Sequence, residues 1–317
     1  MSSQDVERSN AVQVDPLPSW NDSEPKRNIL AFVQSVADQN GPDYVPPAAR
    51  IAVFDNDGTL WSEQPLYIQL AFALDRVKAL APEHPEWRTT QPFRAVLEDD
   101  RHALGTAGVK GLLELVSATH TGMTSDEFDR TAKNWLATAR HPHFNRPYTD
   151  LAYQPMVELL GYLRANGFKT YIVSGGGIEF MRVISEQLYG IPPEQVIGSS
   201  GKIKYELRNG VPVIVRLPEL DFFDDKEGKP VAIQKFIGRR PIAAFGNSDG
   251  DQQMLQWTAA APGHCLMLLV DHTDAEREFG YRVSPMGRLE HALDEAYQRG
   301  WTVVSMKDDW KRIFAFE

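Results

Sequence analysis

The sequence predicts an α/β fold, with a doubly wound, Rossmann-like parallel sheet as its core and a block of α-helices inserted after the first strand. Three short apolar runs predict the strands, because each ends in a turn rich in Gly, Asp or Ser: residues 51–54, 171–173 and 242–245. Helical apolar spacing surrounds these runs. In such a sheet, ligand-binding groups collect at the carboxyl ends of the strands.

The first strand runs directly into Asp55-Asn56-Asp57-Gly58-Thr59. Alternation along a strand places Asp55 and Asp57 on the same side where the strand ends. Two like charges this close need a cation or a shared proton, and Mg²⁺ suits them because it prefers oxygen ligands and accepts substrate phosphate into its shell. The pair predicts phosphoryl transfer, in which Asp55 attacks phosphorus and Asp57 handles the proton. An ordinary Asp-Gly turn is the alternative for this segment alone.

The next strands also end in groups suited to phosphate or metal. The second is followed by Ser174-Gly175-Gly176-Gly177 and an expected helix over residues 178–183, so that backbone amides and a hydroxyl could hold phosphate. A plain glycine-rich turn is the alternative. The third is followed by the oxygen-rich segment 246–251, and upstream of it Lys229 lies at an expected helix start, available to phosphate charge.

In this order, the four segments resemble the motifs of the haloacid dehalogenase-like hydrolase superfamily, and within it the phosphoserine phosphatase branch. The resemblance covers roughly residues 50–270. It implies a Mg²⁺-dependent phosphomonoester hydrolase for a small phosphorylated metabolite, in which Asp55 forms an aspartyl-phosphate and Asp57 serves as acid and base. Lys226 is the alternative for the family's lysine. The implied phosphate site consists of Thr59, Ser174, Gly175, Gly176 and Lys229.

The resemblance also implies a magnesium site made by Asp55, the backbone carbonyl of Asp57 and the fourth motif. Most relatives have an aspartate where this chain has Asn247. An amide ligand carries no charge, so we expect weaker metal binding. Asp251 is assigned to the metal site too, either in the shell or just outside it. Asp249 is a further alternative in the same motif.

Helical apolar spacing over residues 66–80, 109–117 and 128–139 predicts helices between the first and second strands. Relatives place a helical cap there, which excludes water and reads the substrate. The predicted domains are a core of residues 26–61 and 149–317 and a cap of residues 62–148. Because the phosphoserine branch holds the substrate ammonium with a glutamate near the hinge, Glu63 and Gln64 are candidate substrate contacts. Lys110 is a further candidate contact within the cap.

Three other segments carry predictions. Residues 1–25 are rich in Ser, Asp, Asn and Pro without apolar periodicity, which predicts a disordered leader, and residues 27–39 predict a helix. Two apolar runs flank Asn209-Gly210, a pattern typical of a β-hairpin. Cys265, the single cysteine, is expected to be a buried strand residue.

Composition agrees with an enzyme of this type. The 317 residues include 42% hydrophobic residues, enough for a substantial core. The net charge of -10 argues against non-specific nucleic-acid binding, and no run has the apolar length of a membrane span. We expect a small phosphorylated substrate, no nucleic-acid or membrane partner, and a monomer or homodimer. The start shows no secretory signal, so a cytoplasmic location is expected, with a removed signal peptide as the alternative.

Two rival functions remain open at this point. A phosphotransferase, or a phosphatase of broad specificity, would use the same residues. A non-catalytic phosphate-binding module is the more distant alternative, although two carboxylates that face an anion would help such a module little.

Overall fold

The computed structural model describes residues 14–284 and 287–317. Its centre is an eight-stranded sheet in the order β4-β3-β2-β1-β5-β6-β7, with β8 paired to β6. Pairs among β1, β2, β3, β5, β6 and β8 are parallel, whereas β4 and β7 pair antiparallel to their neighbours. The predicted α/β fold with a mostly parallel sheet is therefore confirmed. The strands are β1 (Ile51–Phe54), β2 (Lys169–Gly177), β3 (Val196–Arg208), β4 (Val211–Phe222), β5 (Ala243–Gly246), β6 (Leu266–Thr273), β7 (Gly280–Tyr281) and β8 (Thr302–Ser305).

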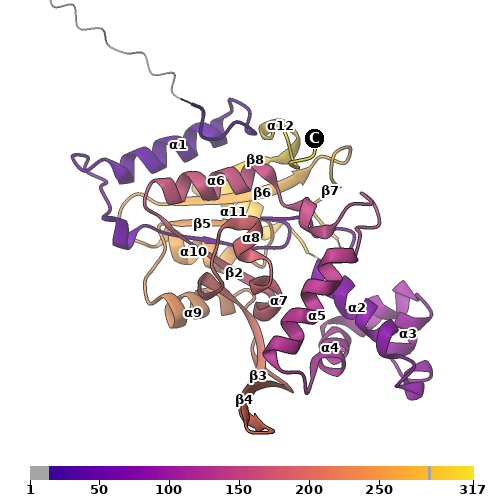
Figure 1. The fold of residues 1–317 in the computed structure, drawn as a ribbon. Coiled ribbons are helices and arrows are strands. Elements are labelled where there is room, and N and C mark those ends of the chain that lie inside the picture. Colours follow the sequence, from indigo (N-terminus) through magenta and orange to yellow (C-terminus); the bar gives the residue numbers. More distant parts are fainter. Residues whose placement is uncertain (1–13, 285–286) are drawn as a thin grey trace, which may run out of the picture.

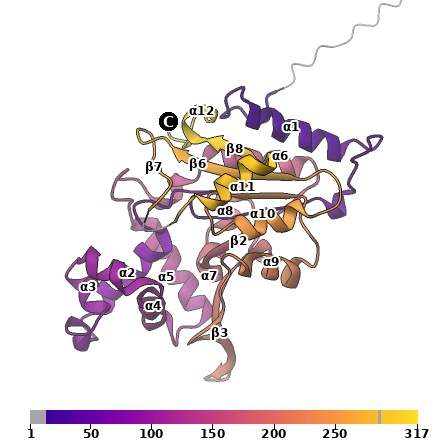
Figure 2. The same ribbon diagram turned by 180° about the vertical axis from the view of Figure 1, so that it is seen from behind.

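Helices cover both faces of the sheet, as Figures 1 and 2 show from opposite sides. One face carries α1 (Glu24–Ala37), α6 (Gln154–Ala165), α7 (Ile178–Arg182) and α8 (Ser185–Tyr189), and the other carries α9 (Gly228–Ala232), α10 (Gln252–Ala259) and α11 (His291–Arg299). Each face of the sheet has its own hydrophobic core. Within β1, Ala52 and Phe54 pack in the core on the side of α1 and α6, and Ile51 and Val53 pack in the core on the side of α10 and α11. A strand that is apolar on both faces is what a sheet covered on both sides requires.

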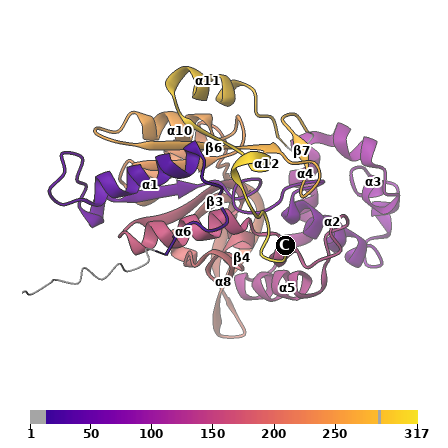
Figure 3. The ribbon, with the colours of Figure 1, turned by 90° about the horizontal axis from the view of Figure 1, so that it is seen from above.

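The helical insertion, residues 68–138, follows β1 and contains α2 (Ile68–Leu80), α3 (Phe93–Leu97), α4 (Arg101–His120) and α5 (Ser125–Thr138). Figure 3 shows these helices grouped on one side of the molecule, away from α1. The insertion has a small core of its own, formed by Val77, Trp87, Phe93, Val96 and Leu115. The helices predicted over 66–80, 109–117 and 128–139 correspond to α2, part of α4 and α5. The division into core and cap domains stays a prediction.

The remaining helix of the described chain is α12 (Met306–Asp309). Single-turn helical segments cover Pro47–Ala49, Pro85–Arg88, Tyr148–Leu151, Pro193–Gln195 and Ile233–Ile237. None of the helices in the described residues combines the length and the apolar character that crossing a membrane demands.

Strands β3 and β4 form a long hairpin that projects from the sheet (Figure 1). Asn209 and Gly210 have φ of 52° and 80°, as a tight hairpin turn requires. The predicted hairpin is therefore confirmed. It also contacts the helical insertion, because Val215 forms a β-bridge with Thr124, next to the start of α5.

Two predictions about local burial are wrong. Residues 14–25 are not a loose leader, because Leu17 is fully buried and Trp20 is 2% exposed. The Trp20 indole donates to the Pro155 carbonyl at 3.0 Å, so that this segment is fixed to α6. Residues 1–13 of the predicted leader lie outside the described residues. Cys265 is only partly buried, because β6 begins one residue later.

Candidate active site

The loop after β1 brings two carboxylates to the carboxyl end of the sheet. Asp55 continues the parallel ladder, since its amide donates to the Phe245 carbonyl at 2.9 Å. The chain then turns back, and the amide of Gly58 donates to the Trp61 carbonyl at 2.8 Å. Gly58 has a φ of 75°, which a residue with a side chain rarely adopts. The turn places Asp57 beside the same end of the sheet, with its Oδ1 accepting from the Trp61 indole at 2.8 Å.

Lys229, at the start of α9, is buried against Asp55. Its Nζ lies 2.8 Å from Oδ1 of Asp55, 2.6 Å from Oδ1 of Asp251 and 3.0 Å from the Val173 carbonyl. Three acceptors match the three protons of an ammonium group. Lys226, the alternative considered from the sequence, is exposed. The structure therefore places Lys229 at the site.

The loop after β5 is organised by Asp251. Its Oδ2 accepts from the backbone amides of Asn247 and Ser248, each at 3.0 Å, while its Oδ1 binds Lys229. Both carboxylate oxygens of Asp251 therefore accept hydrogen bonds from the protein, and its assignment to the metal site stays a prediction. Asn247 itself is 4% exposed and faces the loop after β1.

The end of β2 forms the wall beside Asp57. Gly176 faces this carboxylate, since a Cβ atom at Gly176 would lie 3.4 Å from Oδ2 of Asp57 and 3.6 Å from Oγ of Ser174. Ser174 is buried and accepts from the Gly176 amide at 3.3 Å. Gly175 packs on the loop after β4, where a Cβ atom would lie 3.8 Å from the Asp224 carbonyl. Gly176 and Ser174 therefore lie beside Asp57, whereas Gly175 lies against the loop after β4.

Glu63 lies at the opposite side of the loop after β1. Its Oε1 accepts from the Tyr281 hydroxyl at 2.7 Å and from Nδ2 of Asn247 at 3.3 Å. Thr59, which we expected at the phosphate, donates its hydroxyl to Oδ1 of Asn247 at 3.1 Å. Gln64 points elsewhere and donates to the Ser284 hydroxyl at 2.9 Å.

Two predicted or alternative residues lie apart from this group. Lys110 is exposed on α4, and the described residues show it no hydrogen bond or ion pair with the carboxylates. Asp249 uses its Oδ1 to accept from the amides of Glu290 and Ala292, at 3.0 and 2.9 Å, and thereby holds the start of α11. Neither side chain is positioned as a ligand of the site.

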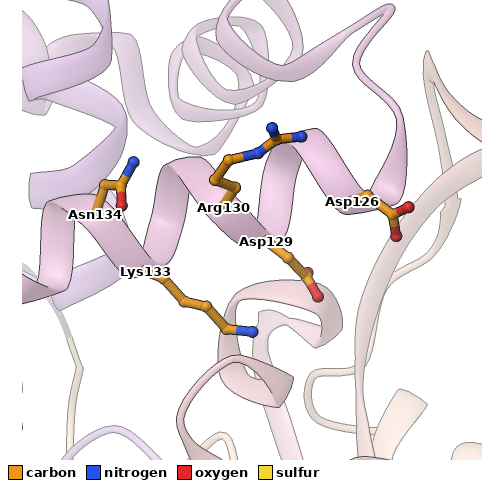
Figure 4. Close-up of a pocket in the computed structure, with 5 residues that line it drawn as sticks. All are labelled: Asp126, Asp129, Arg130, Lys133 and Asn134. Atoms are coloured by element: carbon orange, nitrogen blue, oxygen red, sulfur yellow. The ribbon is translucent and has the colours of Figure 1, made fainter.

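A hollow of about 400 Å³ on the helical insertion is a separate feature. Figure 4 shows that α5 alone lines it. None of the residues discussed above contributes to it, so we do not connect it with the site. Its lining residues are Asp126, Asp129, Arg130, Lys133 and Asn134.

Burial makes the acidic side chains of the site reluctant to ionise. It raises the pKa of Asp55 to about 7, with the Asp251 charge adding to the increase and Lys229 opposing it. Burial raises the pKa of Asp57 to about 6 and that of Glu63 to about 8. A carboxylic acid with a pKa near 6 can both give and take a proton near neutral pH, which is what a general acid and base must do.

The donor set fits a hard cation such as Mg²⁺. Asp55, Asp57 and Asn247 offer only oxygen atoms, and Mg²⁺ needs few protein ligands because it retains several waters. Gly58 allows Asn247 to approach the loop after β1 closely, since a Cβ atom there would overlap the Asn247 amide. Among the described residues, no three His, Cys, Asp or Glu side chains gather as a complete metal cage. Asp55, the Asp57 carbonyl and Asn247 are the residues that would hold such a cation, with its other ligands coming from water or substrate.

Two side chains of the site were not predicted from the sequence. The Trp61 indole donates to Asp57 within the loop after β1. Because Trp61 follows Asp57 by only four residues, the spacing in the sequence could have indicated this contact. Tyr281 binds Glu63 from 218 residues away, and no local pattern marks that contact.

Comparison with known proteins gives one family. A model described as haloacid dehalogenase-like hydrolase matches residues 52–256. No curated protein matches the sequence. A conserved, functionally unknown protein from Anaerococcus prevotii is similar in structure, with a TM-score of 0.58 and 17% identity over 92% of this chain and 94% of that one. A protein with unknown function from Bordetella pertussis is similar with a TM-score of 0.50 and 18% identity over 81% of this chain and 98% of that one. At these identities, the two structures support the fold alone.

Proposed function

Because the chain belongs to the haloacid dehalogenase-like hydrolases, we propose that it hydrolyses phosphomonoesters with Mg²⁺ and through an aspartyl-phosphate on Asp55. The observation that carries the proposal is the pair of Asp55 and Asp57 after β1, with Lys229 at 2.8 Å from Asp55. Displacement of a halide needs no acid for the leaving group, whereas an alkoxide that leaves phosphorus benefits from a proton. The carboxyl group of Asp57 therefore favours phosphoester chemistry.

In the first half of the proposed reaction, a carboxylate oxygen of Asp55 attacks phosphorus, and the bond from phosphorus to the leaving oxygen breaks. Asp57 gives its proton to that oxygen, so that the product leaves as an alcohol. In the second half, Asp57 takes a proton from a water molecule whose oxygen attacks phosphorus. The bond between phosphorus and Asp55 then breaks, which releases inorganic phosphate and restores both carboxyl groups.

The remaining groups act by charge and position. Lys229 adds positive charge next to Asp55, which favours an anionic phosphoryl group at this point. Gly176 leaves room beside Asp57, and Ser174 offers a hydroxyl there. Asp55, the Asp57 carbonyl and Asn247 would hold Mg²⁺, which when bound offsets negative charge on the phosphoryl oxygens. We propose a small phosphorylated metabolite as the substrate, by analogy with the phosphoserine phosphatase branch that the motifs resemble.

The test is hydrolysis of para-nitrophenyl phosphate with and without Mg²⁺. We expect metal-dependent release by the natural chain, and a loss of at least about 10³-fold in Asp55→Asn, which removes the nucleophile. Asp249→Asn is the matched control, because its Oδ1 can still accept from the start of α11. Release that is unchanged in Asp55→Asn would contradict the proposed mechanism.

A further inference from the structure

The side chain of Asn247 is held at both ends. Its Oδ1 accepts from the Thr59 hydroxyl at 3.1 Å, and its Nδ2 donates to Oε1 of Glu63 at 3.3 Å. Asn247 and Glu63 are 4% and 3% exposed, so this contact is shielded from water. The amide oxygen therefore faces the loop after β1, and the amide nitrogen faces a carboxylate.

The packing around the pair shows that the contact is built into the loop. Gly58 lies against both side chains, since a Cβ atom there would overlap Asn247 and would lie 2.8 Å from Cδ of Glu63. The Tyr281 hydroxyl, 2.7 Å from Oε1 of Glu63, fixes the carboxylate from the other side. Two donors thus hold the same oxygen of Glu63 in place.

An amide in this position differs from an isolated amide ligand. When its N–H donates a hydrogen bond to a carboxylate, the amide is polarised and its oxygen carries more negative charge. That oxygen then becomes a stronger ligand for a cation. Charged groups one hydrogen bond behind a metal ligand orient that ligand and tune metal affinity. The second lone pair of the Asn247 oxygen remains available beside the bond from Thr59.

We propose that Glu63 and Asn247 act as one unit toward the divalent cation, in which the amide oxygen of Asn247 binds the cation and Glu63 supplies the negative charge that this amide lacks. The inference rests on the proposed function, because it concerns the metal used there. Glu63 is a positioning residue in this arrangement and acts through Asn247. The Oε1 atom of Glu63 is engaged by Tyr281 and Asn247, and the expected contact of Glu63 with substrate stays a prediction.

The charges of the site agree with this assignment. Four acidic side chains belong to this part of the molecule, and the buried ammonium group of Lys229 binds two of them, Asp55 and Asp251. The buried His272 ring interacts electrostatically with Glu63, but its ion pair is with Glu278. Asp57 and Glu63 have no ion pair with an Arg or Lys side chain among the described residues. Buried carboxylates without a cation are costly, and a divalent cation would compensate for them.

The experiment is calorimetric titration of Mg²⁺ into the full chain, without substrate, for Glu63→Gln, Asn247→Asp and the double variant. We expect Glu63→Gln to weaken Mg²⁺ binding by about 10–100-fold, the range seen when a group behind a metal ligand is lost. The double variant exchanges the positions of charge and amide, so it should recover most of the affinity. Glu114→Gln, on the exposed surface of α4, is the matched control and should bind as the natural chain does.

Thermal melting in EDTA separates folding from metal binding. Asn247→Asp places a second carboxylate against Glu63, so this variant should melt at a lower temperature without metal and regain stability with Mg²⁺. A folded Glu63→Gln that binds Mg²⁺ with unchanged affinity would overturn the inference, as would a double variant that binds no better than Glu63→Gln. No Mg²⁺ binding by the natural chain would instead contradict the metal dependence under the proposed function, and the paired role of Glu63 with it.

Discussion

Lys229 is the residue that connects the motifs of this site, through the hydrogen bonds of its buried ammonium group. It contacts side chains that follow β1 and β5 and the carbonyl of Val173 in β2. Removing a charge from water costs several kcal/mol, so a buried lysine needs compensating charges. Asp55 and Asp251 supply them, and Asp251 in turn binds the amides that position Asn247. The lysine therefore fixes the nucleophile and the metal-binding loop together.

The proton-transfer role of Asp57 can be tested with leaving groups of different basicity. Asp57→Asn retains an oxygen that can accept from Trp61 but cannot give a proton. We expect kcat/KM for a simple alkyl phosphate to fall by about 10²–10⁴-fold, the usual contribution of a general acid. The fall should be smaller for para-nitrophenyl phosphate, because nitrophenolate leaves without a proton. Equal losses for both esters would argue against this role.

At the residue scale, part of the site could be predicted from the sequence. Asp55 and Asp57 were predicted as neighbours because the alternation of one strand decides where they lie. The role of Thr59 toward Asn247 was not predicted, and neither was the contact of Asn247 with Glu63, which lies 184 residues away. Such contacts depend on how β1 and β5 align in the sheet, and no local pattern records that alignment.

At the scale of elements, the β3–β4 hairpin links the helical insertion to the core. Arg216 in β4 makes an ion pair with Glu179 in α7 at 3.0 Å, and its guanidinium group lies over the Phe128 ring of α5 at 4.5 Å. Both side chains of the ion pair are mostly buried, with exposures of 12% and 18%. One arginine thus holds an inserted helix and a core helix to the same strand.

Arg216→Ala should therefore lower the stability of the fold. The loss of a charged hydrogen bond in a shielded place predicts a decrease of about 1–3 kcal/mol in the free energy of unfolding, measured by urea titration. Lys204→Ala, on the same hairpin, removes a more exposed pair with Glu206, so its effect should stay below about 1 kcal/mol. If the two variants were equally stable, the proposed link would be wrong.

Elements with strong local patterns were predicted well. The residues of β1 form a short apolar run that ends in a turn, and the hairpin turn at Asn209-Gly210 needs positive φ at both positions. Strands β7 and β8 were not predicted, because β7 is only two residues long and β8 is short and follows a helix. Short strands depend on the neighbour they pair with more than on their own sequence.

At the scale of the whole molecule, the two ends of the described chain pack together. Trp20 lies edge-on to Trp310, with ring centroids 5.9 Å apart. This contact explains why composition misled the prediction for residues 14–25. A segment poor in apolar residues can still be ordered when its few large side chains enter a core built by distant parts of the chain.

When metal is absent, the free energy of unfolding of the whole protein should decrease as the pH rises. Burial raises the pKa of Asp57 to about 6, of Asp55 and Asp224 to about 7 and of Glu63 to about 8. These acids bind protons more tightly in the folded chain than in the unfolded chain. Their stabilising contribution is complete at pH values below the unfolded pKa and is lost as pH rises through the folded pKa.

We therefore expect the urea concentration at the unfolding midpoint, measured in EDTA, to decrease as the pH is raised from about 5.5 to about 8.5. Mg²⁺ binds ionised carboxylates, so the midpoint gained on adding Mg²⁺ should be larger at the higher pH. Asp224→Asn should reduce the slope, because it removes one of the buried carboxyl groups whose pKa is raised. A midpoint in EDTA that rises over this range would show that these groups are not protonated in the folded protein.

The measurement that tests the central claim most directly is detection of the covalent intermediate. Asp57→Asn lacks the base for the second step, so with Mg²⁺ and para-nitrophenyl phosphate it should accumulate phosphoryl groups on the enzyme. Acid quenching followed by mass spectrometry of peptides should find one phosphoryl group on Asp55. The double variant that also carries Asp55→Asn should show none. Nitrophenol release at a normal rate without phosphorylated Asp55 at any time would contradict the mechanism.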